Sequence, residues 1–382
     1  MVRLNPATAE TDVVVIGGGP AGLAVAIAAR QNGLDVVVAD RAQPPIDKAC
    51  AEGLMPDGIA ALRRIGVELR PEHGSPFRGI RFLDNELEAE ASFPQNVGLG
   101  VRRTVLHRIM MERAEAVGVV TRWNSRVELL APSEVKIDGE TVRCRWIIGA
   151  DGFHSRVRRW AGLAPVWTGA RRFGLRQHFR VRLWTDFVEV YWHNQCQAYV
   201  TPVGPDEVCV AMVGSARQVR ASDLPTLFPA LANRLGGAQA IDTPRGAISM
   251  SVKLNAVTNG HIALVGDASG SVDAITGEGL ALAFRQTSCL AEALAAEDLR
   301  AYDSAHLRIG RMPRLMARVL LLMDGRDGLR RRALRTLATR PRIFSRLLAM
   351  HVGALRPSAI SFDVLDFSLR LLAARTAFGR RT

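Results

Sequence analysis

Near its start the chain holds a strand, a glycine-rich turn, a helix and a second strand, and this order restricts the fold more than any other feature. Residues 12–16 form a short β-branched run that stops at glycine, which is typical of a buried strand. The Ala-rich residues 20–32 predict a helix, and residues 34–39 predict the second strand. Because one crossover helix joins the two strands, they must run parallel in one sheet. The sequence therefore predicts an α/β fold.

The turn between the first strand and the helix has the spacing G-x-G-x-x-G. Gly17 permits the tight turn, Gly19 leaves room for a pyrophosphate, and Gly22 lets helix and strand pack closely. The free N–H groups and the positive end of the helix would then hold the phosphates. Asp40 ends the second strand, where its carboxylate can accept hydrogen bonds from a ribose. A glycine-rich structural turn is the alternative, but strand, helix and terminal acid together favour a dinucleotide site.

Two further acids stand between glycines at the ends of predicted strands. Asp151 lies in the Gly-Ala-Asp-Gly stretch 149–152, and Asp267 lies in the Gly-Asp-Ala-Ser-Gly stretch 266–270. A carboxylate just beyond a strand can reach the hydroxyl groups of a sugar or a ribityl chain. Either turn alone would be weak evidence, since Gly-Asp is common in turns.

A further glycine-containing segment opens a long predicted helix over residues 278–296. It reads Thr-Gly-Glu-Gly, and Gly277 and Gly279 leave room for a flat ring beside the N-terminus of that helix. A helix N-terminus favours negative charge by about 0.3–1 kcal/mol, which suits an electron-rich reduced isoalloxazine.

A second sheet is predicted between residues 173 and 213. Four runs alternate apolar and polar residues and are separated by turn residues, which is typical of antiparallel strands. We expect this sheet to form a second layer; its strands are residues 173–183, 187–193, 196–202 and 207–213.

Composition restricts the class of protein. With 48% hydrophobic and 23% charged residues the chain has an ordinary globular composition. No run approaches the roughly 18 apolar residues of a membrane-spanning helix. The first residues do not form a secretory signal peptide, so we expect a cytoplasmic location. The five cysteines are scattered and never spaced C-x-x-C, which argues against a disulfide framework and a zinc cluster.

In this order the three glycine-flanked turns resemble those of FAD-dependent oxidoreductases of the p-hydroxybenzoate hydroxylase fold. The resemblance covers about residues 12–300 and implies FAD as cofactor. It implies that Asp40 binds the adenosine ribose, that Asp267 binds the ribityl chain, and that Asp151 lies near the pyrophosphate. No second G-x-G-x-x-G exists, so NAD(P)H is expected only as a transient reductant. The predicted cofactor-binding residues are Gly17, Gly19, Ala21, Gly22, Asp40, Arg41, Arg103, Asp151, Asp267, Gly277 and Gly279.

Two stretches narrow the resemblance to geranylgeranyl reductases. Residues 48–54 (Lys-Ala-Cys-Ala-Glu-Gly-Leu) and 273–279 (Asp-Ala-Ile-Thr-Gly-Glu-Gly) are similar to the corresponding stretches of those enzymes. Flavin-dependent halogenases carry a similar Gly-Glu loop. In the reductases the cysteine of the first stretch faces flavin and substrate. The resemblance therefore implies an active-site role for Cys50, with a buried structural thiol as the alternative.

The substrate side departs from this branch. The Tyr-x-Trp-x-Phe-Pro stretch of many such reductases is missing, and residues 197–204 read Gln-Ala-Tyr-Val-Thr-Pro-Val-Gly instead. The sequence therefore favours NAD(P)H-dependent monooxygenation of a hydrophobic small molecule through a hydroperoxide at the flavin C4a position. Reduction of C=C bonds in an isoprenoid- or polyketide-like substrate is the first alternative, and electron transfer to a quinone at a membrane surface is the second. Cys50, Tyr199 and Pro202 are the predicted catalytic residues.

The positive charge is confined to the C-terminal part of the chain. Residues 308–382 hold 17 Arg and four Asp with no Lys or Glu, which accounts for the whole net charge of +13. The segment is broken at three prolines, and apolar residues repeat in it at helical spacing. These stripes predict helices that dock on the flavin domain, or helices drawn to anionic lipid, where each Arg adds about 1 kcal/mol. Few aromatic residues accompany the arginines, which argues against nucleic-acid binding. The prolines are Pro313, Pro341 and Pro357, and the apolar residues are Ile343, Phe344, Leu347, Leu348, Val364, Phe367 and Leu371.

The complete prediction is a Rossmann-like FAD-binding domain with an antiparallel β-sheet substrate domain and a helical C-terminal region. Residues 1–170 and 255–300 are expected to form the FAD-binding domain, with a partial substrate-domain insertion at about residues 76–102. Residues 171–254 are expected to form the substrate domain, and residues 301–382 the basic helical region.

Overall fold

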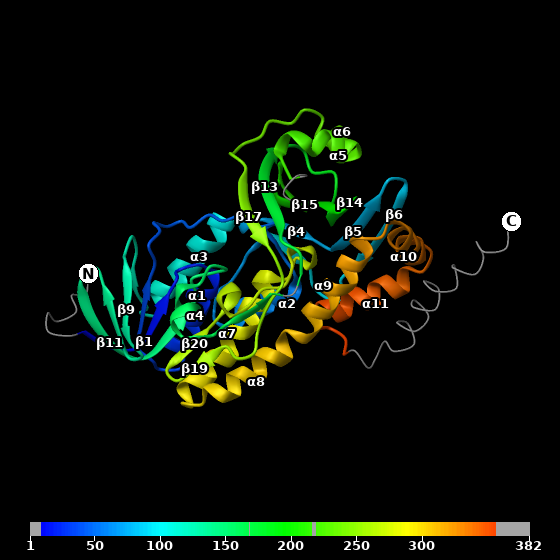
Figure 1. Cartoon of the computed structure of the whole chain (residues 1–382). Helices are drawn as coiled ribbons and strands as arrows, with labels where there is room; N and C mark the ends of the chain where they lie inside the picture. The colour runs from blue at the N-terminus through cyan, green and yellow to red at the C-terminus, as the bar shows by residue number, and fades with distance from the viewer. Residues whose placement is uncertain (1–8, 168, 216–218, 357–382) are drawn as a thin grey trace.

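The computed structural model describes residues 9–167, 169–215 and 219–356, and the statements below concern these residues. Figure 1 shows two sheets whose planes lie apart, with a row of helices that runs beneath both of them. The predicted fold class, α/β with a parallel sheet, a largely antiparallel second sheet and C-terminal helices, is confirmed.

The first sheet contains the predicted β-α-β unit. Strand β1 (Ala9–Ile16) lies in the middle, parallel to β2 (Val36–Ala39) on one side and to β11 (Glu140–Gly149) on the other. Its valines at positions 13–15 are fully buried because helices cover the sheet. The order is β19-β20-β11-β1-β2-β8, and β10 and β9 extend it from β11. The remaining strands are β8 (Val120–Arg122), β9 (Val127–Ala131), β10 (Glu134–Ile137), β19 (Thr258–Asn259) and β20 (Ile262–Leu264).

Helices α1 (Pro20–Gln31), α3 (Arg103–Ala116) and α7 (Gly279–Ala295) pack together over this sheet. Helix α1 lies between the other two, so nearly all of its side chains are buried, and small residues dominate it because three helices meet there. Helix α2 (Pro56–Arg64) packs on α7, the short α4 (Arg156–Trp160) follows β11, and α8 (Leu299–Ile309) runs along α7.

The second sheet has seven strands in the order β17-β13-β16-β15-β14-β5-β6. All neighbours are antiparallel except β5 and β14, which run parallel. Residues 79–92 thus join this sheet although they are distant in sequence from its other strands. The strands are β5 (Gly79–Asp84), β6 (Leu87–Ser92), β13 (Arg172–Arg180), β14 (Val188–His193), β15 (Cys196–Gly204), β16 (Glu207–Gly214) and β17 (Arg245–Ser249).

Short elements connect the two sheets. A three-stranded sheet and a two-stranded sheet lie between them, and small helices cover one end of the second sheet. These elements are β3 (Gly53–Leu54), β4 (Ser75–Phe77), β7 (Gly98–Gly100), β12 (Pro165–Trp167), β18 (Val252–Leu254), η1 (Pro71–His73), η2 (Ala221–Asp223), α5 (Leu224–Leu227), α6 (Pro229–Leu235), η3 (Gly266–Ser269) and η4 (Ala274–Thr276).

The C-terminal helices are α9 (Arg311–Asp324), α10 (Asp327–Thr339) and α11 (Pro341–His351). Their predicted docking on the flavin domain holds only in part, because α9 packs within the predicted FAD-binding residues 255–300 whereas α10 and α11 pack on the second sheet. Helices α10 and α11 pack on β6, and α9 packs on η4. The outer strands of the second sheet carry apolar side chains that these helices bury. Phe344 stacks on Phe82 with ring centroids 5.0 Å apart, and Arg330 forms a buried ion pair with Asp84 at 2.8 Å.

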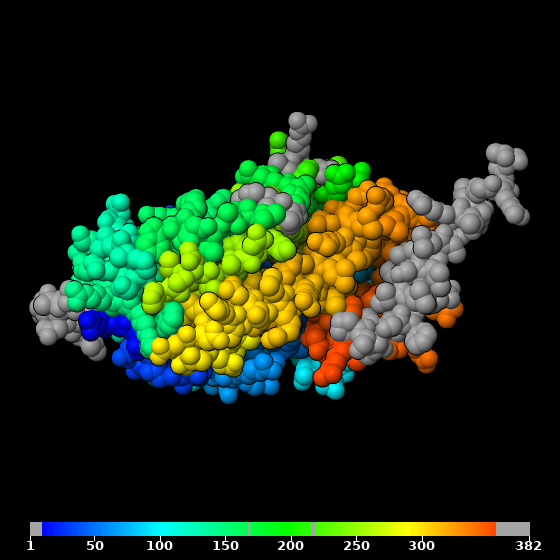
Figure 2. All heavy atoms as spheres, turned by 60° about the horizontal axis from the view of Figure 1, so that its bottom comes forward, coloured from blue at the N-terminus to red at the C-terminus, as the bar shows by residue number. Residues whose placement is uncertain are grey.

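Figure 2 shows α8 and α9, yellow to orange, as one ridge along this face of the molecule. Of the predicted breaks, Pro341 begins α11, but Pro313 lies in the first turn of α9, where a missing N–H is harmless. Pro357 and the second apolar stripe, Val364, Phe367 and Leu371, lie outside the described residues.

Candidate functional site

The three glycine-flanked turns lie side by side at one edge of the first sheet. The Ala150 N–H donates to the carbonyl of Ile16 at 2.8 Å, and the Val265 N–H donates to the carbonyl of Gly149 at 3.0 Å. Gly17 has a φ of +113°, and a Cβ there would lie 2.4 Å from the Ala150 oxygen. Since these strands are parallel neighbours, their carboxyl ends must meet, and a ligand crossing this edge would touch all three turns.

The first turn is open where a phosphate would lie and closed where the helix packs. A Cβ on Gly22 would lie 1.8 Å from the Gly17 oxygen, whereas a Cβ on Gly19 would meet nothing within 4 Å. Gly19 is the N-cap of α1 and provides no side chain to bond the first N–H groups. Those donors and the helix dipole point into open space, as an anion site requires. Ala21 lies in the same turn and packs close to Gly266.

Asp40 holds the glycine turn in place. Its Oδ2 accepts the Gly18 N–H at 2.7 Å and its Oδ1 accepts the Ala42 N–H at 2.8 Å. A Cβ on Gly18 would lie 2.2 Å from the indole of Trp123, so this middle glycine makes room for that ring. Sequence reasoning gave Gly18 and Trp123 no role, although a run of three glycines hinted at a second constraint. Arg41 follows Asp40 and is exposed.

Asp151 and Asp267 both lie close enough to Arg158 for their charges to act on its guanidinium. The Oδ2 of Asp151 accepts the N–H groups of Arg156 and Val157 at 2.7 and 3.2 Å and so caps α4, while its Oδ1 is buried without a protein partner. Arg158 donates to the carbonyl of Ala268 at 3.1 Å, beside Asp267.

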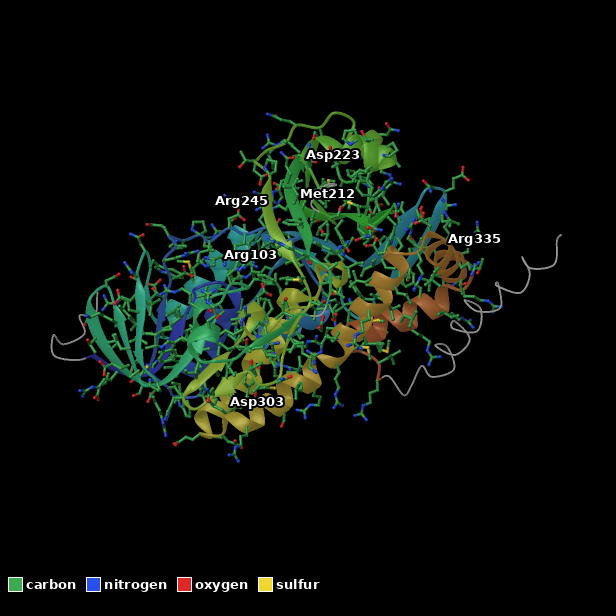
Figure 3. All side chains as sticks on the ribbon, in the orientation of Figure 1. Arg103, Met212, Asp223, Arg245, Asp303 and Arg335 are labelled. Atoms are coloured by element: carbon green, nitrogen blue, oxygen red, sulfur yellow. The ribbon has the colours of Figure 1, made fainter. Side chains whose placement is uncertain are left out.

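Protein surrounds Asp267, but its side chain is open to solvent, as at the bottom of a cleft. The enclosure raises the pKa of Asp267, and the positive charges of Lys48, Arg103 and Arg158 oppose that rise. Arg103, labelled in Figure 3, begins α3, and its Nε is buried without a partner. The cleft therefore presents both a carboxylate and an unpaired guanidinium nitrogen.

The N-terminus of α7 forms the far end of this cleft. Gly277 has a φ of +68°, and both it and Gly279 are exposed. A Cβ on Gly279 would meet nothing within 4 Å, and Glu278, the N-cap, makes no capping bond with its side chain. These features fit an extended dinucleotide with a flat ring. They are the open space at Gly19 and Gly279, the two uncapped helix ends, and the unpaired polar atoms of Asp151 and Arg103.

The comparisons decide the family. The pattern of a family described as "FAD binding domain" matches residues 10–307. The chain belongs to this FAD-binding family. Its sequence is 28% identical to a menaquinone reductase of Mycolicibacterium smegmatis over 333 residues, 78% of this chain and 79% of the relative. It is 29% identical to digeranylgeranylglycerophospholipid reductase 1 of Methanopyrus kandleri over 301 residues, 71% and 76% of the two chains.

A solved structure shares the fold of the chain. A flavoprotein/dehydrogenase of Cytophaga hutchinsonii superposes with a TM-score of 0.82 over 97% of this chain and 100% of that one, at 17% identity. The predicted family is therefore confirmed: this FAD-binding protein is an FAD-dependent oxidoreductase. In it the turns at 17–22, 149–152 and 266–270 would hold FAD.

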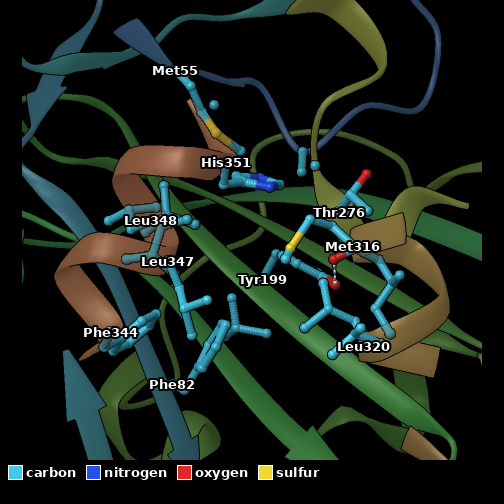
Figure 4. A pocket seen from close by; sticks show the side chains of 18 of the residues that line it. Met55, Phe82, Tyr199, Thr276, Met316, Leu320, Phe344, Leu347, Leu348 and His351 are labelled. Carbon is cyan, nitrogen blue, oxygen red and sulfur yellow. Dashed lines mark hydrogen bonds between the residues drawn. The ribbon is translucent and has the colours of Figure 1, made fainter. Parts of the chain in front are cut away.

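An apolar cavity lies beside the ring end of the cleft, between the second sheet and the C-terminal helices. It measures about 1030 Å³ including its open mouth. Its walls come from β5, β14 and β15 on one side and from α9, α10 and α11 on the other. Figure 4 shows Phe82, Phe344 and Leu347 close together in its wall. Thr276 and Gly277 form one end. A molecule in the cavity would thus reach the position that suits a flat ring.

The predicted catalytic residues have three different surroundings. Tyr199 lines the cavity, and its hydroxyl donates to the carbonyl of Ile275 at 3.0 Å. Pro202 is buried, and its carbonyl packs on Gly100 instead of on the cavity. Cys50 is half-buried, its Sγ accepts the Glu52 N–H at 3.3 Å, and burial raises the pKa of its thiol. Its neighbours at 51 and 53 line the cavity, whereas Cys50 does not.

A buried network supports the loop that carries Cys50. Glu52 adopts a φ of +62°, which is rare for a residue with a side chain. Its carboxylate accepts the Arg103 N–H at 2.8 Å and hydrogen-bonds His178 Nε2 at 2.7 Å, and His178 Nδ1 bonds Asp242 at 2.7 Å. The sequence gave no sign of this network, because its members are far apart along the chain and follow no period.

Three residues in and beside this network have side chains of the kinds that bind metal ions. Ligand atoms of Glu52, His178 and Cys209 lie within 4.8 Å of one another, and all three residues are buried. The guanidinium of Arg176 lies 2.8 Å from His178 Nδ1, so a positive charge already stands at this group. The carboxylate and imidazole bond each other, and the geometry is that of a hydrogen-bonded network.

Proposed function

We propose that this oxidoreductase saturates a carbon–carbon double bond of an isoprenoid-like substrate held in the apolar cavity. The observation that carries the proposal is the position of the cavity, which is apolar and ends at Thr276 and Gly277, beside the space for the flavin ring. The two curated relatives are named as reductases of menaquinone and of digeranylgeranylglycerophospholipid, both of which carry isoprenoid chains. Sequence reasoning favoured monooxygenation; these relatives favour its alternative.

Different residues of the chain would hold the cofactor and the substrate. Reduced FAD, when bound, supplies the hydride, and we propose NAD(P)H as the transient electron donor because the chain has no second dinucleotide motif. The apolar walls hold the substrate chain and exclude water. Tyr199 holds the carbonyl of Ile275, which keeps η4 at the end of the cavity. Asp267 and Arg103 would hold the cofactor at the bottom of the cleft.

Anaerobic turnover tests the reaction type. The purified yellow protein is reduced with NADPH or dithionite without oxygen and mixed with a menaquinone that carries a short polyprenyl chain. We expect reoxidation of the flavin and, once air has reoxidised any quinol, a quinone with two additional hydrogen atoms in its prenyl chain, detected by mass spectrometry. A product that forms only after air is admitted and contains one oxygen atom would instead show monooxygenation. Flavin reoxidation with the prenyl chain unchanged would show electron transfer to the quinone.

We also propose that the protein takes this substrate from an anionic lipid surface through α9. Leu315, Val319 and Leu322 are 49%, 37% and 46% exposed and share one face of α9 with the exposed Arg311 and Arg318. Val319 also lines the cavity, so the exposed stripe continues into it. An apolar stripe flanked by arginines suits the boundary between head groups and acyl chains. Among the described residues no helix has the length and apolar character needed to cross a membrane.

Vesicle binding tests this surface. Replacing both Leu315 and Leu322 by glutamine is expected to weaken binding to vesicles containing phosphatidylglycerol by at least about 10-fold. Two leucine side chains that become buried in the lipid contribute well over 1.4 kcal/mol to the free energy of binding. Flotation of the FAD-loaded protein measures it.

The matched control replaces Leu130 and Val166 by glutamine. These two side chains are 47% and 46% exposed and do not belong to α9. Equal losses for both pairs, or no binding by the unaltered protein, would contradict docking through α9.

A further inference from the structure

The cavity of the proposed reductase has almost no groups that can exchange a proton. Among the described side chains that line it, only Tyr199 and His351 are titratable. The Tyr199 hydroxyl already donates to a backbone carbonyl, and burial raises the pKa of that hydroxyl. His351 is the other lining group that can exchange a proton.

His351 reaches the reacting end of the cavity from a helix beyond the part of the chain that the FAD-binding family covers. It is the last residue of α11, and Figure 4 shows its ring between Met55 and Thr276. The backbone of Thr276 bonds the ring. Since Gly277 follows directly, the imidazole lies at the end where substrate and flavin ring would meet.

The buried carboxyl group of Glu278 lies next to this imidazole. Glu278 is 2% exposed, its Oε2 has no hydrogen-bond partner, and the His351 Nδ1 lies 3.7 Å from that oxygen. Farther back, the single guanidinium of Arg285 lies 3.8 Å from Glu278 and 3.6 Å from Asp57. One arginine thus faces two buried carboxyl groups without a full hydrogen bond to either, which leaves one negative charge uncompensated if both ionise.

The electrostatic surroundings of Glu278 and His351 determine which of the two holds a proton. Burial raises the pKa of Glu278 to about 8; Arg285 opposes this and Asp57 adds to it. Burial lowers the pKa of His351 to about 4; Asp57 and the Thr276 backbone oppose this and Arg285 adds to it. Near neutral pH the acid therefore holds the proton and the imidazole is neutral. Its one N–H must leave the Thr276 carbonyl to reach a substrate, and its other nitrogen can accept a proton.

We propose that His351 is a catalytic residue of the proposed reduction, which protonates the substrate, and that Glu278 returns the proton to its imidazole. In this step the substrate C=C accepts a hydride at one carbon from the reduced flavin. The other carbon forms a C–H bond with the proton of His351, whose N–H breaks, and the proton of Glu278 moves to the other ring nitrogen. The flavin loses two electrons, the alkene gains two hydrogen atoms, and Glu278 ends as a carboxylate that bulk water reprotonates.

Anaerobic single turnover of the pre-reduced holoenzyme in D₂O tests this proposal. We expect H351N and H351Q to bind FAD and accept electrons from NADPH as the unaltered protein does. Both should slow flavin reoxidation by the prenylated quinone about 100-fold, the usual contribution of a positioned acid. The deuterium should also enter both faces of the alkene, because water replaces a donor fixed on one side. NMR of the product reads out this facial selectivity.

Glu278 and the cavity wall provide the companion variants. The rate of the unaltered protein should fall above about pH 8, where Glu278 loses its proton, and E278Q should remove this fall while lowering the rate. L347M, on the same helix and in the same wall, should change substrate affinity and keep the facial selectivity.

Unchanged rate and selectivity in both His351 variants would overturn the proposal, and so would the same loss of selectivity in L347M. If C50S alone lost selectivity, Cys50 would be the donor and His351 would not. Failure of the unaltered protein to reduce the alkene would instead overturn the proposed function, and the two failures are thus distinguishable.

Discussion

Replacing Arg172 with leucine is expected to lower the free energy of unfolding by about 3–5 kcal/mol, because it leaves two buried carboxylates unpaired. Arg172 is 6% exposed at the start of β13. It donates to Asp273 at 2.8 Å and to the carbonyl of Val213 at 3.1 Å, bonds Gln197, and lies 3.4 Å from Asp324. This one guanidinium thereby joins the second sheet, the turn before η4 and the end of α9. Urea unfolding followed by circular dichroism measures the loss.

The control is a surface pair of the same chemistry. Arg145 pairs with Glu297, and both side chains are substantially exposed, at 41% and 59%. Arg145→Leu should change the unfolding free energy by no more than about 1 kcal/mol. If the two leucine variants unfold at the same urea concentration, the buried network does not stabilise the junction.

The sequence predicted the parts of the fold that local rules determine. The β-α-β unit and the four alternating runs of the second sheet follow from side-chain period and glycine position alone, so their elements were found within a few residues. The three glycine-flanked turns could be placed at one edge because parallel strands end together. The family resemblance then indicated which ligand such an edge would hold.

Residues paired across long distances could not be predicted this way. Trp123 against Gly18, His178 between Glu52 and Asp242, and α10 on β6 are each brought together by the whole fold and leave no periodic pattern in the sequence. The docking of α10 and α11 on the second sheet was missed for this reason. Their apolar stripes were visible, but the surface they cover, on β5 and β6, depends on how residues 79–92 join the second sheet.

One error was avoidable. Tyr199 and Pro202 were both predicted to face the substrate, but they are three positions apart on one strand, and side chains at odd spacing point to opposite faces. In the structure Tyr199 and Thr201, two positions apart, line the cavity and Pro202 does not. Strand alternation would have selected Thr201 as the partner of Tyr199.

Two substitutions in one turn should separate folding of the phosphate loop from binding of the phosphate. A methyl group on Gly22 would meet the Gly17 carbonyl at 1.8 Å, so Gly22→Ala must displace the backbone of the turn. A methyl group on Gly19 would meet nothing within 4 Å, and the φ of −71° there suits alanine. Both variants should lose at least about 100-fold in FAD affinity, equivalent to about 2.8 kcal/mol, but only Gly22→Ala should also lower the melting temperature of the apoprotein.

Absorbance at 450 nm of the purified proteins measures bound flavin, and thermal unfolding after removal of the flavin measures the fold. Gly328→Ala is the control, because Gly328 is exposed on α10 and a methyl group there also meets nothing within 4 Å. It should remain yellow and equally stable. The missing side chain at Gly19 leaves the space that the phosphates would occupy, whereas the close contact at Gly22 shapes the turn. A fully yellow Gly19→Ala variant would therefore mean that the pyrophosphate does not pass over Gly19.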